Sequence, residues 1–530
     1  MKKKILVSDK MATEGVDILK EVKDFEVDCK FGIKPDELKS IIKEYDALVV
    51  RSGTKVTADI IEAADKLKFI GRAGVGVDNV DLKAATKKGI VVMNTPGGNT
   101  TSTAEHAMSL ILALSRNIPQ ACASLKSGKW ERSKFTGVEL HGKILGIIGL
   151  GRIGSSIARM AKSFGMTIIS YDPFISMEIA SKMEVEMVEL NDLLKRSDYI
   201  TIHTPKSAET KSLISDKEFA IMKKTARIIN CARGGIVDEK ALIKALESGQ
   251  IAGCALDVYE TEPPPADSPL FKFDHCVATP HLGASTSEAQ VNVAVEVAQI
   301  IRDALLGKGI VNATNFPSVD AKSYKVLEPY IDLAERMGRF AGQLVSGRIN
   351  EIQITYNGAM TEYKVVPVTM ALVYGLLSPI LGEETVNAVN AMDVAKERAI
   401  KIQEITSNEE AEFVNLISVE VKTDKEPLAI WGTLSSNKQP RIVKVNSVYV
   451  EAKPEGHMLF INNNDRPGIV GAVGTILAKD NINIGGITFG RESQGGRVIS
   501  VVNVDSEVPE SVIEKLRKEK DILFVKMLRV

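Results

Sequence analysis

Residues 143–172, KILGIIGLGRIGSSIARMAKSFGMTIISYD, decide the fold of this chain. The apolar run at 144–148 predicts a buried strand, and Gly149-Leu150-Gly151-Arg152-Ile153-Gly154 follows it and opens the helical stretch SSIARMAKSFG. A second apolar run ends in Asp172, 18 residues after Gly154. A GxGxxG motif alone is weak, but this strand–turn–helix–strand–acid context predicts a dinucleotide-binding βαβ unit.

Each glycine of this motif has its own physical task. Gly149 permits the tight turn, Gly151 lets the backbone approach a pyrophosphate, and Gly154 lets the helix pack closely on the strand. The helix N-terminus presents unpaired N–H groups to the phosphates. Asp172 can accept hydrogen bonds from both ribose hydroxyls and would repel a 2′-phosphate, so the sequence predicts NAD, although Arg152 weakens the discrimination against NADP. The predicted cofactor contacts here are Gly149, Gly151, Arg152, Ile153, Gly154 and Asp172.

The alternation of strands and helices extends to both sides of this unit. Short β-rich runs alternate with helical patterns through residues 1–97, and apolar runs that end in polar or Gly/Pro residues recur through 199–283. Such alternation predicts parallel sheets covered on both faces, which bind ligands at the carboxyl ends of their strands. The cofactor contacts predicted at these strand ends are Thr204, Pro205, Cys231, Asp257 and Gly283.

Three polar residues follow successive strands downstream of the fingerprint. Removing a hydride from a secondary alcohol requires a base for the hydroxyl proton and a cation for a neighbouring carboxylate. Arg233 in NCARGG suits a carboxylate bidentately, and His281 in TPHLG can exchange a proton near neutral pH, with Glu262 stabilising the imidazolium. Each alone has a structural explanation, but their joint occurrence predicts a catalytic group.

Two further cations stand at strand ends near the N-terminus. Arg51-Ser52-Gly53 follows ALVV, and Arg72 with Gly74 follows KFI. An arginine beside flexible backbone N–H groups suits a carboxylate or a phosphate. The sequence therefore predicts that Arg51, Ser52, Gly53, Arg72 and Gly74 bind substrate, the alternative being surface ion pairs.

The blocks around Arg233, Glu262 and His281 resemble the signatures of the D-isomer-specific 2-hydroxyacid dehydrogenases. The whole chain is similar in outline to the long-form members of that family, with the most specific motifs in the first 317 residues. The resemblance implies that Arg233 binds the substrate carboxylate, that His281 is the acid/base paired with Glu262, and that Asn99 lies near the substrate. A charged stretch around Arg132 would approach the active site of a neighbouring subunit.

The same resemblance implies a reaction. Long-form members oxidise 3-phospho-D-glycerate to 3-phosphohydroxypyruvate with NAD, the first step of L-serine biosynthesis. A glyoxylate or hydroxypyruvate reductase of the same family is the alternative enzyme, although a simple reductase lacks the C-terminal extension. A redox-sensing binding protein that kept the fold is the alternative from another class.

The resemblance also implies four domains, one of them inserted in another. The fold predicted is α/β, with two Rossmann-like doubly wound parallel sheets, an intervening α+β domain and a ferredoxin-like βαββαβ ACT domain. The expected boundaries are 1–97 with 285–317 for the substrate-binding domain, 98–284 for the NAD-binding domain, 318–452 for a regulatory or assembly domain, and 456–530 for the ACT domain. Closure would occur about hinges near Gly97-Gly98 and Ala284-Ser285.

The C-terminal segment 464–471, NDRPGIVG, carries the resemblance to ACT domains. Asp465 and Asn483 match positions that hold the amine and carboxylate of L-serine in regulated relatives. L-serine is therefore the expected effector, but Asn463 stands where certain regulated relatives have an aromatic hydroxyl, and a purely structural dimerisation module is the alternative. A homodimer or homotetramer is expected.

Composition excludes several function classes. Lys+Arg is 67 and Asp+Glu is 68, so the charge balance gives no reason to bind nucleic acid or an anionic membrane. No apolar run approaches the roughly 18 residues that a membrane span needs. The five cysteines are scattered, which predicts reduced thiols in a cytoplasmic protein with neither disulfides nor a metal site.

Overall fold

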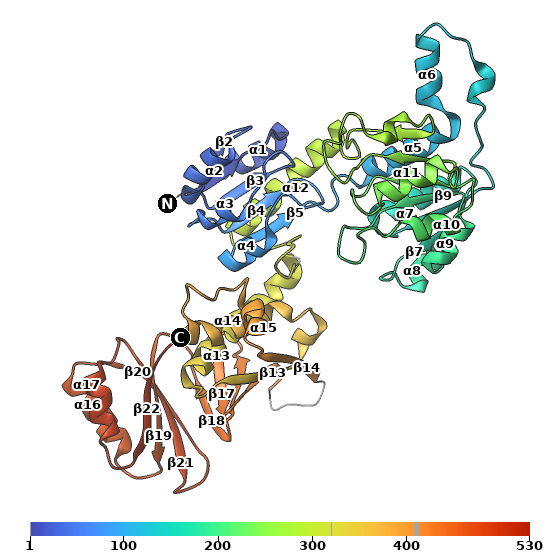
Figure 1. Cartoon of the computed structure of the whole chain (residues 1–530). Coiled ribbons are helices and arrows are strands. Elements are labelled where there is room, and N and C mark those ends of the chain that lie inside the picture. Colours follow the sequence, from blue (N-terminus) through green and yellow to red (C-terminus); the bar gives the residue numbers. More distant parts are fainter. Residues whose placement is uncertain (1, 320, 408–412) are drawn as a thin grey trace.

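The computed structural model describes residues 2–319, 321–407 and 413–530, and the strands in these ranges form four sheets (Figure 1). The first two sheets are wholly parallel and lie in separate lobes. The other two belong to the C-terminal part of the chain. This arrangement confirms the predicted fold class.

The first sheet has the strand order β2-β1-β3-β4-β5. Its central strand, β3, is buried on both faces, with Ala47, Leu48 and Val50 at 0 % exposure, as expected for a parallel strand between two helical layers. The strands are β1 (Lys3–Val7), β2 (Phe25–Cys29), β3 (Ala47–Val50), β4 (Phe69–Arg72) and β5 (Val91–Asn94). The helices are α1 (Thr13–Lys20), α2 (Pro35–Ile41), α3 (Ala58–Glu62) and α4 (Leu82–Lys88).

One helix of this lobe comes from much later in the chain. Helix α12 (Ser287–Leu305) packs beside α1 on the first sheet, as Figure 1 shows. The two helices approach so closely that a Cβ on Gly15 would lie 2.4 Å from the carbonyl oxygen of Ala294. The chain therefore crosses from the first lobe to the second and returns.

The second sheet has the order β12-β11-β10-β9-β6-β7-β8. The chain enters at β6, runs outward through β7 and β8, and returns to pair β9 with the other side of β6. This reversal makes a crevice at the carboxyl ends of β6 and β9, the usual ligand position in open α/β sheets. The strands are β6 (Ile144–Ile148), β7 (Thr167–Tyr171), β8 (Glu186–Met187), β9 (Tyr199–Ile202), β10 (Arg227–Asn230), β11 (Gly253–Leu256) and β12 (Cys276–Ala278).

Helices cover both faces of this sheet, as the doubly wound prediction requires. They are α5 (Thr100–Arg116), α7 (Arg152–Ser163), α8 (Met177–Lys182), α9 (Leu190–Arg196), α10 (Asp216–Ile221) and α11 (Glu239–Glu247). Helix α7 begins at Arg152, inside the glycine motif and earlier than the SSIARM stretch suggested. The reason is that Gly149, with φ 93°, makes the turn and Gly151 already takes the N-cap position.

The third sheet, β14-β13-β15-β16-β17-β18, is covered by two helices, α13 (Ala321–Leu344) and α14 (Val366–Leu381), with α15 (Ala391–Glu397) beside them. The two long helices meet at glycines: a Cβ on Gly338 would lie 2.2 Å from the oxygen of Leu372. Strands β13 and β14 are parallel and the others antiparallel. The strands are β13 (Ile349–Asn357), β14 (Lys401–Ser407), β15 (Leu416–Thr423), β16 (Leu428–Leu434), β17 (Pro440–Val445) and β18 (Val448–Ala452).

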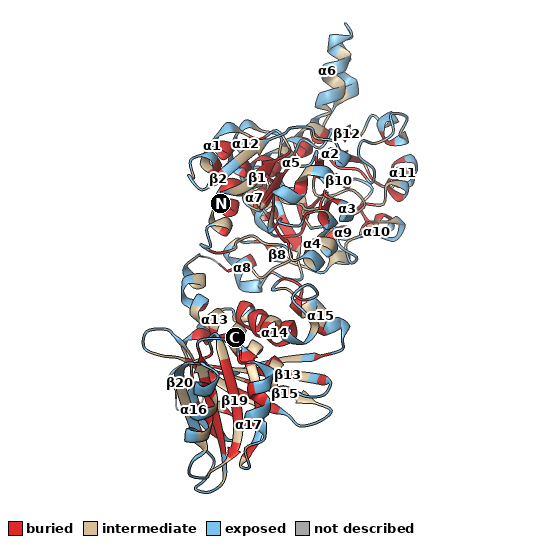
Figure 2. Ribbon diagram, turned by 90° about the vertical axis from the view of Figure 1, so that its left-hand side faces the viewer, coloured by how far each residue is buried: buried red, intermediate tan, exposed pale blue. Residues whose placement is uncertain are grey.

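The fourth sheet is antiparallel, with the order β20-β21-β19-β22, and carries two helices. Its buried face is red in Figure 2. This is the ferredoxin-like βαββαβ arrangement predicted for the C-terminus. The elements are β19 (His457–Asn464), α16 (Ile469–Lys479), β20 (Ile484–Arg491), β21 (Arg497–Val504), α17 (Glu510–Arg517) and β22 (Ile522–Arg529).

An arm projects from the second lobe. Helix α6 (Ile118–Lys126) stands away from the rest of the chain and contains no buried residue (Figure 2). Trp130 follows it with 78 % of its surface exposed, and Arg132 is exposed just beyond. Arg132 thus lies on the arm, and its role toward a neighbouring subunit stays a prediction.

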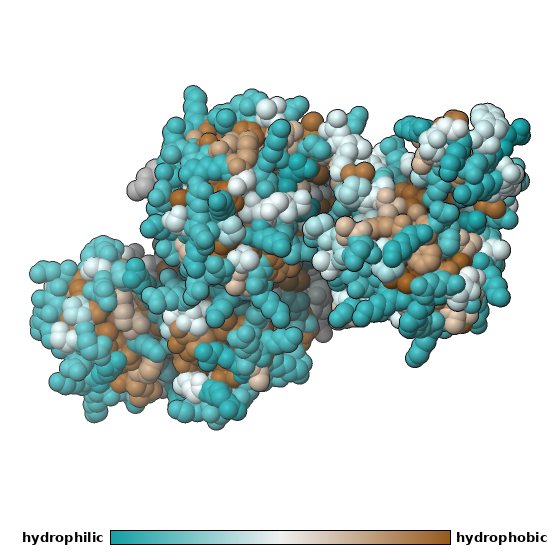
Figure 3. All heavy atoms as spheres, turned by 45° about the horizontal axis from the view of Figure 1, so that its top comes forward, coloured by the Kyte–Doolittle hydropathy of each residue, from teal (hydrophilic) through white to brown (hydrophobic). Residues whose placement is uncertain are grey.

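On the face shown in Figure 3, hydrophilic residues prevail and hydrophobic residues gather in patches. Within the described ranges, no helix has both the length and the apolar character to cross a membrane. In the same ranges no three His, Cys, Asp or Glu side chains converge as metal ligands, and all five cysteines are free thiols.

The contact between α1 and α12 yields a stability prediction. We expect Gly15→Val to lower the free energy of unfolding by about 1–3 kcal/mol because its side chain must push α12 away. Asp17→Val, on the exposed face of the same helix, is the matched control for helix propensity. Denaturant unfolding of both variants checks this, and equal effects would mean that α1 and α12 do not pack together.

Candidate active site

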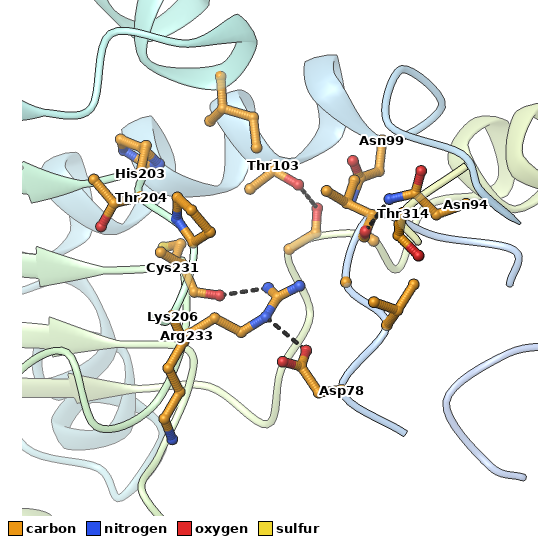
Figure 4. Close-up of a pocket in the computed structure, with 18 of the residues that line it drawn as sticks. Asp78, Asn94, Asn99, Thr103, His203, Thr204, Lys206, Cys231, Arg233 and Thr314 are labelled. Atoms are coloured by element: carbon orange, nitrogen blue, oxygen red, sulfur yellow. Dashed lines mark hydrogen bonds and ion pairs between the residues drawn. The ribbon is translucent and has the colours of Figure 1, made fainter. Parts of the chain in front are cut away.

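A cavity of about 690 Å³ lies where the carboxyl ends of the two parallel sheets face each other. Gly76, Asp78 and Asn94 reach it from the first lobe, and Thr204 and Arg233 from the second. Figure 4 shows Asp78 and Asn94 on one side of the cavity and Thr204 and Arg233 on the other. Of the residues predicted from sequence, the lining includes Asn99, Ile153, Thr204, Pro205, Cys231, Arg233, Asp257, His281 and Gly283.

The predicted acid/base pair is in contact. His281 Nδ1 lies 2.7 Å from Glu262 Oε2, and Glu262 Oε1 accepts a 3.1 Å hydrogen bond from the backbone N–H of Tyr259. Because Nδ1 faces the carboxylate, Nε2 is the ring nitrogen that remains for a substrate proton. His281 lines the cavity, whereas Glu262 is exposed and is not among the lining residues. The backbone of His281 is left-handed, with φ 55°.

Arg233 spans the two lobes. Its Nε donates to Asp78 Oδ2 at 3.1 Å and its Nη1 donates to the carbonyl of Ala232 at 2.6 Å (Figure 4). A Cβ on Gly76 would lie 1.9 Å from Nη2, so any side chain at position 76 would displace the guanidinium from this place. In the described part of the chain, no protein acceptor is recorded for Nη2.

The other predicted cations, Arg72 and Arg51, are not among the residues that line the cavity. Burial lowers the pKa of Arg72 to about 10, the charge of Arg233 adds to this, and Asp78 partly offsets it. The guanidinium of Arg72 occupies the space that a Cβ on Gly74 would take, at 1.7 Å, where φ is +147°. Arg51 Nη1 donates to the carbonyl of Lys10. In the described structure, Arg51, Ser52, Gly53, Arg72 and Gly74 are absent from the lining, unlike Asn99.

The crevice beside the fingerprint fits a dinucleotide. A Cβ on Gly151 would meet no atom of the described residues within 4 Å, whereas one on Gly154 would lie 2.1 Å from the oxygen of Gly149. The motif thus leaves space on one side and packs tightly on the other. Gly149, Gly151, Arg152 and Gly154 stand at the edge of the cavity rather than in its lining.

Asp172 stands at the end of β7, also outside the lining. Each of its carboxylate oxygens accepts one 2.8 Å backbone hydrogen bond, from Leu150 and from Phe174. This fixes the carboxylate next to the glycine turn while each oxygen keeps acceptor capacity for a ribose hydroxyl.

Several buried polar atoms in this region lack a partner among the described residues. They are Thr204 Oγ1, Asn99 Oδ1 and His203 Nδ1. Buried polar groups normally find partners, so these atoms are suited to a bound polar ligand. Burial lowers the pKa of His203 to about 3, which keeps this ring neutral. Burial, together with the charge of Asp257, raises the pKa of the Cys231 thiol, so this cysteine is no nucleophile.

Asp257 is fully buried beneath the loop that carries His281. It accepts hydrogen bonds from Leu282 N at 2.7 Å, Gly283 N at 2.8 Å and Thr279 Oγ1 at 2.6 Å. Burial works to raise the pKa of Asp257, but hydrogen bonds from His106, Thr279 and Leu282 outweigh it, and the pKa lies below its usual range. An ionised carboxylate therefore anchors this loop.

The two residues predicted to hold an effector are engaged by their own domain. Asp465 Oδ2 accepts from the backbone N–H of Gly495 at 3.0 Å and lies 3.5 Å from Arg491 Nη1. Asn483 Nδ2 donates to Asp505 Oδ2 at 2.6 Å. A ligand at this position would have to share these side chains.

Sequence reasoning missed several cavity residues, among them Asp78, His203, Lys206 and Thr103. Asp78 ends the stretch GRAGVGVD, which also contains Arg72. Its place in this stretch was therefore a sequence signal for an acid that faces the catalytic cations. His203 and Lys206 flank Thr204-Pro205 at the end of β9. Thr103 lies on helix α5, where no motif distinguished it from the helical pattern around it.

Comparison with known proteins agrees with this geometry. Three family profiles match: "D-isomer specific 2-hydroxyacid dehydrogenase, NAD binding domain" over residues 108–283, "D-3-phosphoglycerate dehydrogenase intervening domain" over 326–446, and "ACT domain" over 457–521.

Similar proteins extend over nearly the whole chain. A D-3-phosphoglycerate dehydrogenase of Methanocaldococcus jannaschii is 46% identical over 99% of this chain and 100% of its own length. One of Synechocystis is 45% identical over 97% of this chain and 92% of its own. A D-lactate dehydrogenase of Aquifex aeolicus, solved with NAD and lactic acid, has a TM-score of 0.53 and 28% identity over 59% of this chain and 100% of its own.

The lobes, the paired histidine and glutamate, and identity along almost the entire length lead to one assignment: the chain belongs to the D-3-phosphoglycerate dehydrogenases, within the D-isomer specific 2-hydroxyacid dehydrogenase family.

Proposed function

We propose that the chain oxidises 3-phospho-D-glycerate to 3-phosphohydroxypyruvate with NAD, opening L-serine biosynthesis. The observation that carries the proposal is the cavity lined by both Arg233 and His281, with Glu262 Oε2 2.7 Å from His281 Nδ1. A cation and a proton acceptor thus face one space beside a dinucleotide fingerprint.

His281 Nε2 takes the hydroxyl proton as the C–H bond breaks. Its Nδ1–H donates to Glu262, whose charge stabilises the imidazolium that forms. Arg233 directs its Nη2 at the substrate carboxylate, because Asp78 and Ala232 already hold Nε and Nη1. NAD, when bound, supplies the acceptor for the hydride. Gly149, Gly151, Arg152, Ile153 and Gly154 would hold its pyrophosphate, and Asp172 its ribose.

Arg72 and Arg51 are proposed to hold the phosphate of the substrate. The charge of Arg51 lies close enough to lower the pKa of Arg72, and the charge of Arg233 lowers the pKa of Arg72 as well. Three neighbouring cations suit a substrate with a carboxylate at one end and a phosphate at the other. Ser52, Gly53 and Gly74 supply backbone around them, with Asn99 at the cavity wall. This charge argues against a simple glyoxylate reductase.

The proposed domain division follows the course of the chain. Residues 1–97 and 285–317 would bind substrate and 98–284 would bind NAD, because α12 packs on the first sheet. Residues 318–452 would serve regulation or assembly, and 456–530 would form the ACT domain. L-serine at Asp465 and Asn483 is the proposed effector. The exposed α6 arm supports a homodimer or homotetramer, and the free thiols suit the cytoplasm.

A substrate panel tests the proposal. NAD reduction would be measured with 3-phospho-D-glycerate, D-glycerate and D-lactate, each with and without L-serine. Preference for the phosphorylated acid supports the assignment. Equal rates with D-glycerate would remove the role given to Arg51 and Arg72, and no turnover of any acid would overturn it.

The acid/base pair gives a sharp expectation. We expect His281→Ala to lower kcat by about 10²–10⁴-fold because the variant lacks the ring nitrogen that takes the hydroxyl proton. The dissociation constant of NADH should stay nearly unchanged, since the glycine motif is untouched. His141→Ala, on the surface, is the control. Turnover and NADH binding lost to the same extent would point to a folding role for His281.

Arginine at position 233 should not be replaceable by lysine. We expect Arg233→Lys to raise KM for the hydroxy acid by about ten- to a hundred-fold, the cost of a hydrogen bond to a charged group. Lysine carries one nitrogen and cannot contact Asp78, Ala232 and a carboxylate together. Steady-state kinetics check this, with exposed Arg159→Lys as control. An unchanged KM would remove Arg233 from carboxylate binding.

Asp172 should set the choice of dinucleotide. We expect Asp172→Ala to lower kcat/KM for NAD by about tenfold, the value of one such hydrogen bond, while kcat/KM for NADP rises because the repulsion of the 2′-phosphate is gone. Glu178→Ala, an exposed carboxylate just beyond, is the control. Unchanged use of both dinucleotides would contradict a ribose contact at Asp172.

A further inference from the structure

Helix α5 contacts the loop that carries His281 at three points. Ser102 Oγ lies 2.7 Å from Thr286 Oγ1, and Thr103 Oγ1 donates to the carbonyl of Gly283 at 3.2 Å. His106, one turn further along the helix, makes the third contact. Its Nε2 lies 3.2 Å from Asp257 Oδ1 and 3.3 Å from Thr279 Oγ1. The spacing 102, 103 and 106 puts these side chains on one face of the helix.

The hydrogen-bond network assigns the proton of His106. Thr279 lies 2.6 Å from Asp257 Oδ1, and a carboxylate only accepts, so the threonine hydroxyl donates to it. The lone pairs of Thr279 Oγ1 then face the imidazole. Both neighbours of Nε2 are acceptors, so Nε2 carries a hydrogen that the two oxygens share.

The Nε2–H of His106 thus contacts both Asp257 and Thr279, the two residues that hold the loop around His281. Asp257 holds the loop after His281 through Leu282 N and Gly283 N, and Thr279 holds the loop before it. The carbonyl of Thr279 accepts from His281 N at 3.1 Å and from the hydroxyl of Tyr259 at 3.0 Å. The left-handed backbone of His281 lies between these anchors and depends on them.

We propose that His106 is a positioning residue for the reaction. Its Nε2–H fixes Asp257 and Thr279 relative to each other, and these two set the place of His281 over the cavity. The inference rests on the acid/base role given to His281 under the proposed function. His106 itself does not line the cavity. Its removal should therefore act on turnover more than on binding.

Three substitutions separate a hydrogen-bonding role from a packing role. His106→Phe keeps the bulk and removes the donor. His106→Gln carries its amide nitrogen about where Nε2 stands, and His106→Asn carries one about where Nδ1 stands, short of Asp257. The control is His141→Gln, on the surface of the same lobe.

We expect kcat of the Phe and Asn variants to fall by about ten- to a hundred-fold, since small displacements of a catalytic group have such effects. The KM for the hydroxy acid and the Kd for NADH, followed by fluorescence, should change less than about twofold by the same reasoning. The Gln variant should recover most of kcat, and the His141 control should match the wild type.

Each other outcome overturns the inference. A Phe variant with wild-type kcat would mean that the Nε2–H of residue 106 does not contribute to turnover. Gln and Asn variants that are equally impaired would mean that the position of the donor nitrogen does not matter. Loss of NADH binding in parallel with kcat indicates a structural role. If the Phe variant does not fold, the Gln and Asn pair alone decides. The assays use whichever hydroxy acid the wild type oxidises best, so a wrong substrate assignment leaves this test intact.

Discussion

The active cavity depends on one geometric constraint: parallel strands that share a sheet end on the same edge. Strands β9 to β12 finish side by side, so Thr204, Arg233, Asp257 and His281 meet although 77 residues separate the first from the last. No local interaction could assemble these groups. The apolar runs that form these strands therefore determine the chemistry as much as the polar residues that follow them.

The buried carboxylate of Asp257 turns that convergence into a defined geometry. A strand end leads into a loop, and a loop alone would leave His281 loosely placed. Asp257 gathers two backbone N–H groups, a hydroxyl and an imidazole around one charge, and the charge stays ionised because these donors outweigh burial. The loop that carries His281 is thus held by its hydrogen bonds to Asp257, and the imidazole of His281 is held by its contact with Glu262.

Sequence alone predicted the fold because the signals were local and redundant. The GxGxxG turn, the apolar strand runs and the βαββαβ pattern each report on neighbouring residues, and parallel sheets and a ferredoxin-like unit follow from their order. The grouping of Arg233, Glu262 and His281 was accessible as well, since strand ends converge by rule. Their roles, and those of the predicted substrate and effector residues, stay predictions. The ion pair of Arg233 with Asp78 and the contact of His106 with Asp257 were not accessible, because they depend on side-chain directions between distant segments.

The chain passes between its two N-terminal lobes twice, once before α5 and once before α12. A single connecting segment would let the two lobes rotate freely relative to each other. Two neighbouring connecting segments restrict this motion to a rotation about the line that joins them. Any movement of one lobe relative to the other would then follow one path, and the contact between Arg233 and Asp78 would form again in the same register. A protease that cuts only one of the two connecting segments would leave the lobes attached.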